Sequence, residues 1–206
     1  SDPCKPSIDN FYLDFNSLVY NVIQYVDNYS YPYAEICDQV CRFVDLLIQI
    51  VRPRYTIFIG VDGPTPFAKC REQRIRRFKA LKDSSPKKFD TAKISLGTQF
   101  MEILHETLSS FLKERAKNDL AYKDVDIIYS SVHAVGEGEK KIFDFIQKTK
   151  DHFGPNATHC IFSHDSDVII NGLHLHIPFL YVMRDWKNWM GPIENCGNGK
   201  LNELEA

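Results

Sequence analysis

The chain of 206 residues is 44% hydrophobic, 13% aromatic and 25% charged, which fits one globular domain and excludes a disordered, collagenous or low-complexity polymer. Lys and Arg number 25 against 27 Asp and Glu, a formal charge of -2, so any basic surface for nucleic acid must be local. No apolar run reaches the roughly 18 residues of a membrane span, and six scattered cysteines without zinc-site spacing indicate free thiols, so we expect a cytoplasmic or, alternatively, nuclear protein without a membrane partner.

Short runs of branched and aromatic residues predict strands, and apolar residues at helical spacing predict helices between them. The expected strands are residues 11–15, 55–61, 125–129, 159–162 and 179–183. The expected helices are residues 35–51, a basic helix after Pro66, and residues 98–117, 139–148 and 167–173, with a loop over 82–93. Alternation of strand and helix predicts one domain over residues 1–206, an α/β/α sandwich on a mostly parallel sheet, with an irregular tail over 190–206.

Carboxylates stand at or beyond the carboxyl ends of four predicted strands, the edge at which open parallel sheets bind their ligands. A single Asp after a strand is more often a helix cap or a turn residue. Their coincidence at four strand ends instead predicts one anionic site, which comprises Asp14, Asp62, Glu137, Glu139, Asp165 and Asp167.

Six like charges at one edge repel one another unless cations neutralise them. Oxygen ligands without cysteine or an evident histidine set favour Mg²⁺ or Mn²⁺ over zinc, and two ions about 4 Å apart can hold the attacking and leaving oxygens of a phosphodiester. We therefore predict that the six acids bind two such ions and are the catalytic residues. Gly136 and Gly138 allow the backbone to turn tightly beside them.

A strongly basic helix is predicted directly after the second acidic strand end. Residues 69–82 contain seven Lys and Arg against one anion, Glu72. Four of its polar residues fall on a single helical face: Lys69, Gln73, Arg76 and Arg77. Arginine binds phosphate oxygens in pairs, lysine adds a point charge and glutamine a neutral donor. A solvated basic face is the ordinary alternative, but the adjoining acids favour a phosphate-binding pocket.

These stretches together resemble the conserved N-terminal region of the XRN family of 5′-to-3′ exoribonucleases. The similarity runs in family order from about Phe11 to Leu173. It is carried by Tyr12-Leu13-Asp14-Phe15-Asn16, Val61-Asp62-Gly63, Ala68-Lys69 with Gln73-Arg74 and Arg76-Arg77-Phe78, Gly97-Thr98-Gln99-Phe100-Met101, Gly136-Glu137-Gly138-Glu139-Lys140-Lys141-Ile142, and Asp165-Ser166-Asp167.

The resemblance implies a PIN-like sandwich shared with flap endonucleases. It also implies that the six acids bind metal, and that Lys69, Gln73, Arg76 and Arg77 recognise a 5′-monophosphate. The implied reaction is two-metal hydrolysis of the first phosphodiester of single-stranded RNA, which releases a mononucleotide, and a cap or triphosphate would not fit the pocket.

Three positions depart from the family pattern. Tyr20 stands where the family usually has a histidine that stacks on the first base, and its ring can also stack. Ile75 replaces a usual glycine, and Val135 a usual proline. The similarity covers the first conserved region, whereas a seventh acid and a stacking tryptophan belong to a second. Two alternatives therefore stay open: a catalytically impaired RNA-binding module, and a flap or structure-specific nuclease of the same fold.

Overall fold

The computed structural model describes residues 6–24, 32–83 and 89–184, with only the backbone course for 76–83. The strands are β1 (Asn10–Asp14), β2 (Thr56–Gly60), β3 (Asp126–Ser130), β4 (His159–Phe162) and β5 (Leu180–Met183). The helices are α1 (Phe15–Gln24), α2 (Tyr33–Val51), α3 (Phe67–Asp83), α4 (Gln99–Asn118), α5 (Gly138–Phe153) and α6 (Asp167–His174). Two short 3₁₀ turns, η1 (Thr91–Lys93) and η2 (Leu120–Tyr122), flank α4.

The five strands form one parallel sheet in the order β3-β2-β1-β4-β5. The chain steps outward from β1 through β2 to β3, then returns to pair β4 with the opposite edge of β1. This reversal between β1 and β4 opens a crevice at the carboxyl ends of the strands, where doubly wound sheets bind ligands. The predicted sandwich on a mostly parallel sheet is confirmed, with every described pairing parallel.

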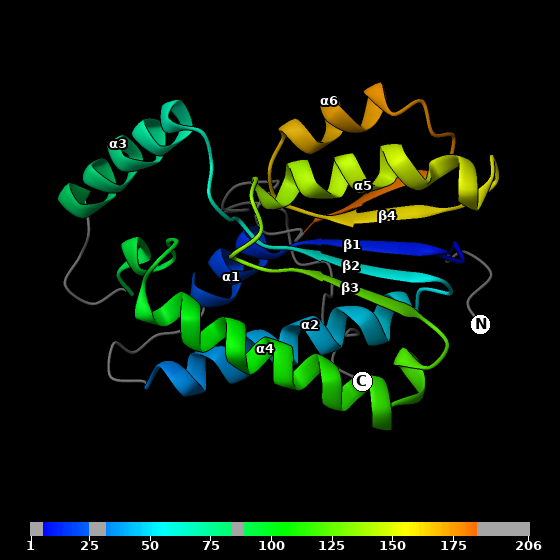
Figure 1. The fold of residues 1–206 in the computed structure, drawn as a ribbon, viewed down its shortest axis with the longest axis horizontal. Helices are drawn as coiled ribbons and strands as arrows, with labels where there is room; N and C mark the ends of the chain where they lie inside the picture. Colours follow the sequence, from blue (N-terminus) through cyan, green and yellow to red (C-terminus); the bar gives the residue numbers. More distant parts are fainter. Residues whose placement is uncertain (1–5, 25–31, 84–88, 185–206) are drawn as a thin grey trace, which may run out of the picture.

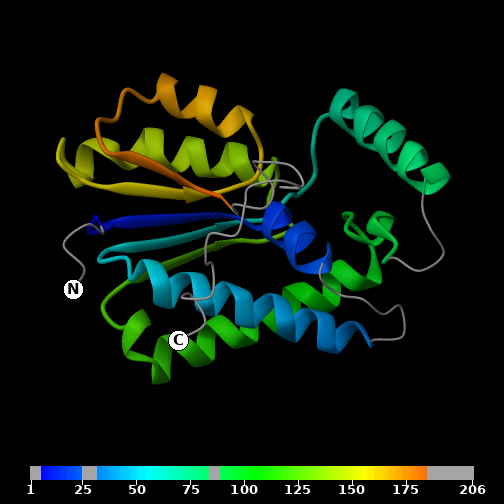
Figure 2. The same ribbon diagram turned by 180° about the vertical axis from the view of Figure 1, so that it is seen from behind.

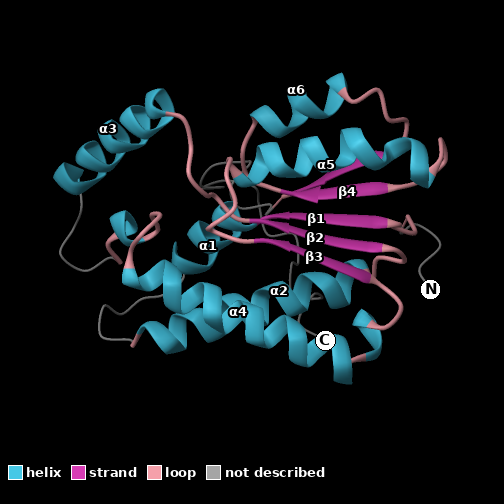
Figure 3. Cartoon of the chain, viewed as in Figure 1, coloured by secondary structure: helices cyan, strands magenta, loops and turns pink. Residues whose placement is uncertain are grey.

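Helices cover both faces of the sheet, α2 and α4 on one and α5 and α6 on the other (Figures 1 and 3). The pleat of β1 divides the core accordingly. Phe11 and Leu13 join the cluster under α2 and α4, whereas Tyr12 between them joins the cluster under α5. All three side chains have no exposed surface. The rotated view shows α1 and α3 beyond the carboxyl ends of the strands, with α3 projecting from the sandwich (Figure 2).

The long helices form because their apolar residues recur every three or four positions. In α2 the buried stripe runs through Ile36, Val40, Val44 and Ile48. The α4 helix begins where Thr98 Oγ1 accepts a hydrogen bond from the amide of Met101 over 3.4 Å, an N-terminal cap. Among the described residues, none of these helices combines the length and apolarity of a membrane span.

Two of the differences from the sequence-based expectation bear on the site. The first strand ends at Asp14 rather than Phe15, and α1 starts at once, because Asp14 Oδ1 accepts a hydrogen bond from the amide of Ser17 in the first helical turn. Helix α3 continues to Asp83, and η1 occupies part of the remaining expected loop. The expected irregular tail over 190–206 lies outside the described residues.

Candidate active site

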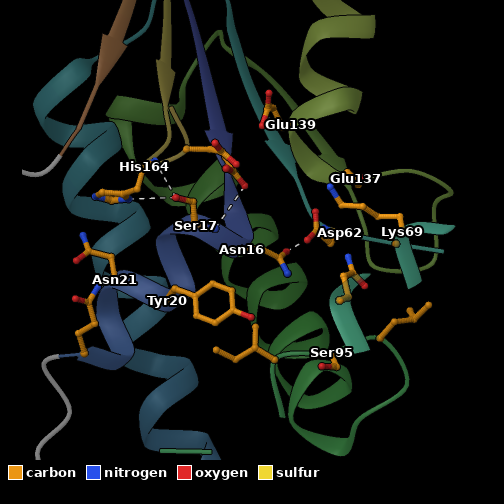
Figure 4. Close-up of a pocket in the computed structure, with 17 residues that line it drawn as sticks. Asn16, Ser17, Tyr20, Asn21, Asp62, Lys69, Ser95, Glu137, Glu139 and His164 are labelled. Carbon is orange, nitrogen blue, oxygen red and sulfur yellow. Dashed lines mark hydrogen bonds and ion pairs between the residues drawn. The ribbon is translucent and has the colours of Figure 1, made fainter. Parts of the chain in front are cut away.

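A cavity of about 530 Å³ lies beyond the carboxyl ends of β1, β2 and β4 (Figure 4). Its size falls within the range of small-molecule sites. Helices α1 and α3 and the segment between η1 and α4 complete its wall. Five of the six predicted acids line it: Asp14, Asp62, Glu137, Glu139 and Asp165. The fold therefore brings together carboxylates that are as much as 151 residues apart in the sequence.

Asp14 is the most deeply buried of these acids, with 8% of its surface exposed. Its Oδ2 accepts a hydrogen bond from Ser163 Oγ over 2.7 Å, while Oδ1 accepts the weaker bond from the Ser17 amide. Burial above all, together with the nearby charges of Asp62 and Glu139, raises the pKa of Asp14 to about 7 in spite of these hydrogen bonds. The Asp14 carboxylate thus lies in a desolvated environment of negative electrostatic potential.

Asp62 follows β2 and connects it to the start of α5. Its amide donates to Asn16 Oδ1 over 3.0 Å, and its Oδ1 accepts from the amide of Gly138 over 2.7 Å. Burial, with a contribution from the charge of Glu137, raises the pKa of Asp62 above its usual range in spite of the Gly138 hydrogen bond. The side chain is therefore held between two backbone segments.

Glu137 directly precedes α5, and Glu139 lies in the first turn of this helix. Gly136 has φ 109, which allows the tight turn before Glu137. Glu137 Oε2 lies 3.0 Å from Lys69 Nζ, an ion pair that joins α5 to α3. Glu139 Oε1 accepts from Asn171 Nδ2 of α6 over 2.7 Å. Burial, and then the charges of Asp165, Asp167 and Glu137, raise the pKa of Glu139.

The last two acids follow β4. The amide of Asp165 donates to Ser163 Oγ over 3.1 Å, and Asp165 Oδ1 accepts from the amide of Asp167 over 3.0 Å. Asp165 lines the cavity, whereas Asp167, in the first turn of α6, is exposed and is not part of the cavity wall. The negative charge of Asp167 still acts on the site, because its repulsion contributes to the raised pKa of Glu139.

The chemistry of this donor set fits a hard divalent cation, since all the acidic donors are oxygens and three of them have raised pKa values in a shared negative field. Within residues 6–24, 32–83 and 89–184, however, no three His, Cys, Asp or Glu side chains are gathered closely enough to hold an ion. Cation binding would require these carboxylates to turn towards one another, away from partners such as Lys69.

The predicted phosphate-binding face lies beside the acids. Lys69 and Gln73 of α3 line the same cavity. Arg76 and Arg77 follow on α3, but their side chains lie outside the described part of the chain. Tyr20, the predicted stacking residue, lines the cavity from α1 and is 44% exposed (Figure 4). The roles of these residues, like those of the acids, stay predictions.

Further lining residues were not predicted from the sequence. Ser17, Asn21 and Gln24 line the cavity together with Tyr20 because they share one face of α1. Their spacing in the sequence carried that signal, but no helix was expected there. His164 also lines the cavity; its backbone amide donates to Ser17 Oγ over 2.8 Å, and its Nδ1 lies 3.1 Å from the same oxygen.

The sequence profile of the XRN 5′-3′ exonuclease N-terminus matches residues 1–88 and 82–186. The chain belongs to this family. It is 36% identical over 200 residues to 5′-3′ exoribonuclease 1 of Saccharomyces cerevisiae, covering 87% of this chain and 13% of that protein. Identity to the human protein of the same name is 32% over 200 residues, again 87% of this chain and 12% of the relative. For 5′-3′ exoribonuclease 2 of Arabidopsis thaliana it is 31% over 228 residues, 95% of this chain and 22% of that protein.

The resemblance to the XRN family inferred from the acidic and basic motifs is thus confirmed. The chain spans between 12% and 22% of the length of these three XRN relatives. The family profile nevertheless matches all four acidic strand ends and α3, so the cavity described above lies wholly within the XRN-matching part of the chain.

Proposed function

We propose that this chain carries the catalytic centre of a metal-dependent 5′-to-3′ exoribonuclease, which hydrolyses 5′-monophosphorylated single-stranded RNA to mononucleotides. The observation that carries the proposal is the shared cavity, in which five carboxylates from four strand ends meet Lys69 and Gln73 of α3. Anionic groups for cations and cationic groups for a phosphate, side by side, suit the end of a nucleic acid strand. The names of the relatives, which are 5′-3′ exoribonucleases, support the exoribonuclease activity in this proposal.

The acids would hold Mg²⁺ or Mn²⁺, with Asp14, Asp62, Glu137, Glu139 and Asp165 around the cavity and Asp167 at its margin. Two bound ions would stabilise the charge that develops on the phosphodiester oxygens. Neighbouring residues of the chain orient the carboxylates. Ser163 and Gly138 orient the carboxylates of Asp14 and Asp62 through hydrogen bonds of 2.7 Å each.

Lys69 and Gln73 would bind the 5′-monophosphate, together with Arg76 and Arg77 further along α3. Lys69 Nζ is held 3.0 Å from Glu137 and is about one-third exposed, so the ammonium group stands at the boundary between the acidic and basic walls. Tyr20 would offer its ring to the terminal base, a contact that tolerates any base.

The test is cleavage of three single-stranded RNAs of one sequence, carrying a 5′-monophosphate, a 5′-hydroxyl or a cap, by the purified chain in Mg²⁺. We expect mononucleotide release from the monophosphate alone, and its loss in Asp165→Ala and Asp167→Ala. Asp38→Ala, which removes an exposed carboxylate of α2 paired with Arg42, is the matched control and should keep full activity. Unchanged rates in both site variants would refute the assignment of the acids.

Other outcomes identify the alternatives. Internal cuts in branched DNA would indicate a structure-specific nuclease. Tight binding of 5′-phosphorylated RNA without cleavage would indicate an RNA-binding module.

The phosphate preference has its own test. Lys69→Gln should reduce the preference for 5′-monophosphorylated over 5′-hydroxyl RNA about tenfold, because one charge-assisted contact to phosphate is lost. Arg74→Gln on the same helix is the control, since Arg74 is exposed and is not part of the cavity wall. An equal loss in both variants would mean that the basic helix attracts RNA by its general charge only.

A further inference from the structure

Two buried polar atoms of the cavity wall, one on Asn21 and one on Ser95, lack a hydrogen-bond partner among the described residues. Asn21 of α1 is 3% exposed, and Ser95, between η1 and α4, is 7% exposed. Neither Asn21 Oδ1 nor Ser95 Oγ has a partner within the described part of the chain. Buried polar groups are normally paired, and an unpaired one destabilises the fold. Two in the wall of one cavity therefore point to a ligand that supplies the missing bonds.

Their position indicates which part of a substrate they would meet. In Figure 4, Asn21, Tyr20 and Ser95 lie on the side of the cavity away from Glu139. Under the proposed function, the acids act on the phosphodiester and the α3 wall takes the 5′-phosphate. The wall that contains Asn21, Tyr20 and Ser95 is then left for the terminal nucleoside.

We propose that Asn21 and Ser95 are specificity-determining residues that hydrogen-bond the 5′-terminal nucleoside. Asn21 Oδ1 is an acceptor, so it requires a donor such as a ribose hydroxyl or an exocyclic amine of the base. Ser95 Oγ both donates and accepts, which complements either group. Both atoms are shielded from solvent, so a side-chain rotation would accompany ligand entry. This inference rests on the proposed function and adds the element that reads the nucleoside.

The local structure allows both groups to be removed with little harm to the fold. The backbone at Ser95 is fixed through its carbonyl oxygen, which accepts from Thr98 Oγ1 over 2.9 Å and from the Thr98 amide over 3.2 Å. Ser95→Ala deletes the unpaired hydroxyl alone. Asn21→Leu replaces an amide with an apolar group of similar size, in a helix whose neighbouring residues Leu18 and Val19 are buried. If these polar groups serve a ligand, both variants should be as stable as the parent or more stable.

The experiment measures equilibrium binding of 5′-monophosphorylated oligonucleotides by fluorescence anisotropy, with Ca²⁺ in place of Mg²⁺ to limit hydrolysis. Three oligonucleotides differ only in the first nucleotide: guanosine, 2′-deoxyguanosine and inosine, which lacks the exocyclic amine. We expect the parent to bind the oligonucleotide that begins with guanosine about fivefold more tightly than one of the other two, the 2′-deoxyguanosine or the inosine oligonucleotide. A difference of about fivefold in affinity is the effect of one hydrogen bond. The 2′-deoxy arm reports a sugar contact and the inosine arm a base contact.

In Asn21→Leu and Ser95→Ala the ratio of affinities for the guanosine oligonucleotide and the less tightly bound one should fall towards one. The thermal midpoint of each variant should equal or exceed that of the parent. Asn10→Leu is the matched control: Asn10 is also fully buried with an unpaired amide, but it lies at the opposite end of β1 and is not part of the cavity wall. This control should keep the parent ratio. If Asn21→Leu does not fold, Ser95→Ala alone decides.

Three results would overturn the inference. A parent that binds all three oligonucleotides equally would refute it and leave the proposed function standing. A parental ratio that persists in both variants would assign the discrimination to other residues. A parent that binds no 5′-phosphorylated oligonucleotide would refute the proposed function and the nucleoside-reading role together.

Discussion

Ser163 Oγ donates a hydrogen bond of 2.7 Å to Asp14 Oδ2 and so joins the carboxyl ends of β4 and β1 at the crevice of the sheet. The same oxygen accepts from the amide of Asp165 over 3.1 Å, and Ser163 has no exposed surface. The buried hydroxyl of Ser163 therefore orients the carboxylate of Asp14 and also fixes the backbone at Asp165.

Loss of this hydroxyl should weaken the fold measurably. Ser163→Ala leaves a buried carboxylate oxygen and an amide without their partner, which should lower the free energy of unfolding by about 1–3 kcal/mol. Urea denaturation at neutral pH measures the change. Ser166→Ala is the control, because Ser166 makes no side-chain capping bond at α6, and it should change stability by less than about 0.5 kcal/mol. Equal effects of the two substitutions would contradict a structural role for Ser163.

Stability without divalent ions should fall as the pH rises from about 4 to about 7. Burial raises the pKa of Asp14 to about 7, so between these limits the folded state binds more protons than the unfolded state. Protonated Asp14 is stabilising below its usual pKa, and the benefit is lost as the pH passes through the folded value. The pKa values of Asp62 and Glu139 are raised as well, so they act in the same direction.

Denaturation in EDTA across this range measures the slope, to which one fully shifted carboxyl contributes up to about 1.4 kcal/mol per pH unit. Asp14→Asn should flatten it. Asp9 should not disturb this measurement. Burial raises the pKa of Asp9, but hydrogen bonds with Thr158 and Arg54 outweigh it and lower the pKa. Asp9 therefore affects stability in the opposite sense to Asp14, and it does so below about pH 4, outside the measured range. A slope that is unchanged in Asp14→Asn would show that the Asp14 carboxyl is not the titrating group.

Divalent cations should stabilise the folded chain. If the acids bind metal as proposed, Mg²⁺ or Mn²⁺ at about a hundred times its dissociation constant should add about 2.7 kcal/mol, because the ion would bind carboxylates that only the folded chain brings to one cavity. The thermal midpoint should therefore rise by about 5–10 °C over that in EDTA. Asp14→Asn and Asp165→Asn should reduce the rise, while Asp38→Asn should retain it, because Asp38 on α2 is exposed and is not part of the cavity wall. A rise of the same size in all three variants would indicate nonspecific ion binding.

Gly138 should not tolerate a side chain. A Cβ there would lie 2.5 Å from the carbonyl oxygen of Gly60, a backbone atom of β2 that cannot yield without moving the strand. Gly138→Ala should therefore cost about 1–3 kcal/mol and weaken the bond from the Gly138 amide to Asp62. Gly172→Ala is a matched helical control, since its Cβ would meet only the tip of the Leu180 side chain, 2.8 Å away. Comparable losses in the two variants would contradict the importance of this backbone contact.

The sequence by itself determined the sheet and its acidic edge. Strand β4 matches its predicted bounds, and the other strands differ by one or two residues, because branched and aromatic runs between polar ends mark buried parallel strands from local pattern alone. The position of an acid at a strand end is also a local property. Parallel pairing then places all such ends at one edge, so the gathering of Asp14, Asp62, Glu137 and Asp165 follows from the order of strands and helices.

The tertiary structure decided what the sequence pattern left open. Which wall an acid faces depends on helix packing, so only the fold pairs Glu137 with Lys69, leaves Asp167 at the margin and exposes Tyr20 to the cavity. Helix α1 was not predicted, because it begins at the residue that directly follows β1. The place of Asn21 in the cavity wall was therefore not predicted either. An unpaired buried group such as Asn21 Oδ1 is visible only once every neighbour has its place, because hydrogen bonding there is decided by contacts between segments distant along the chain.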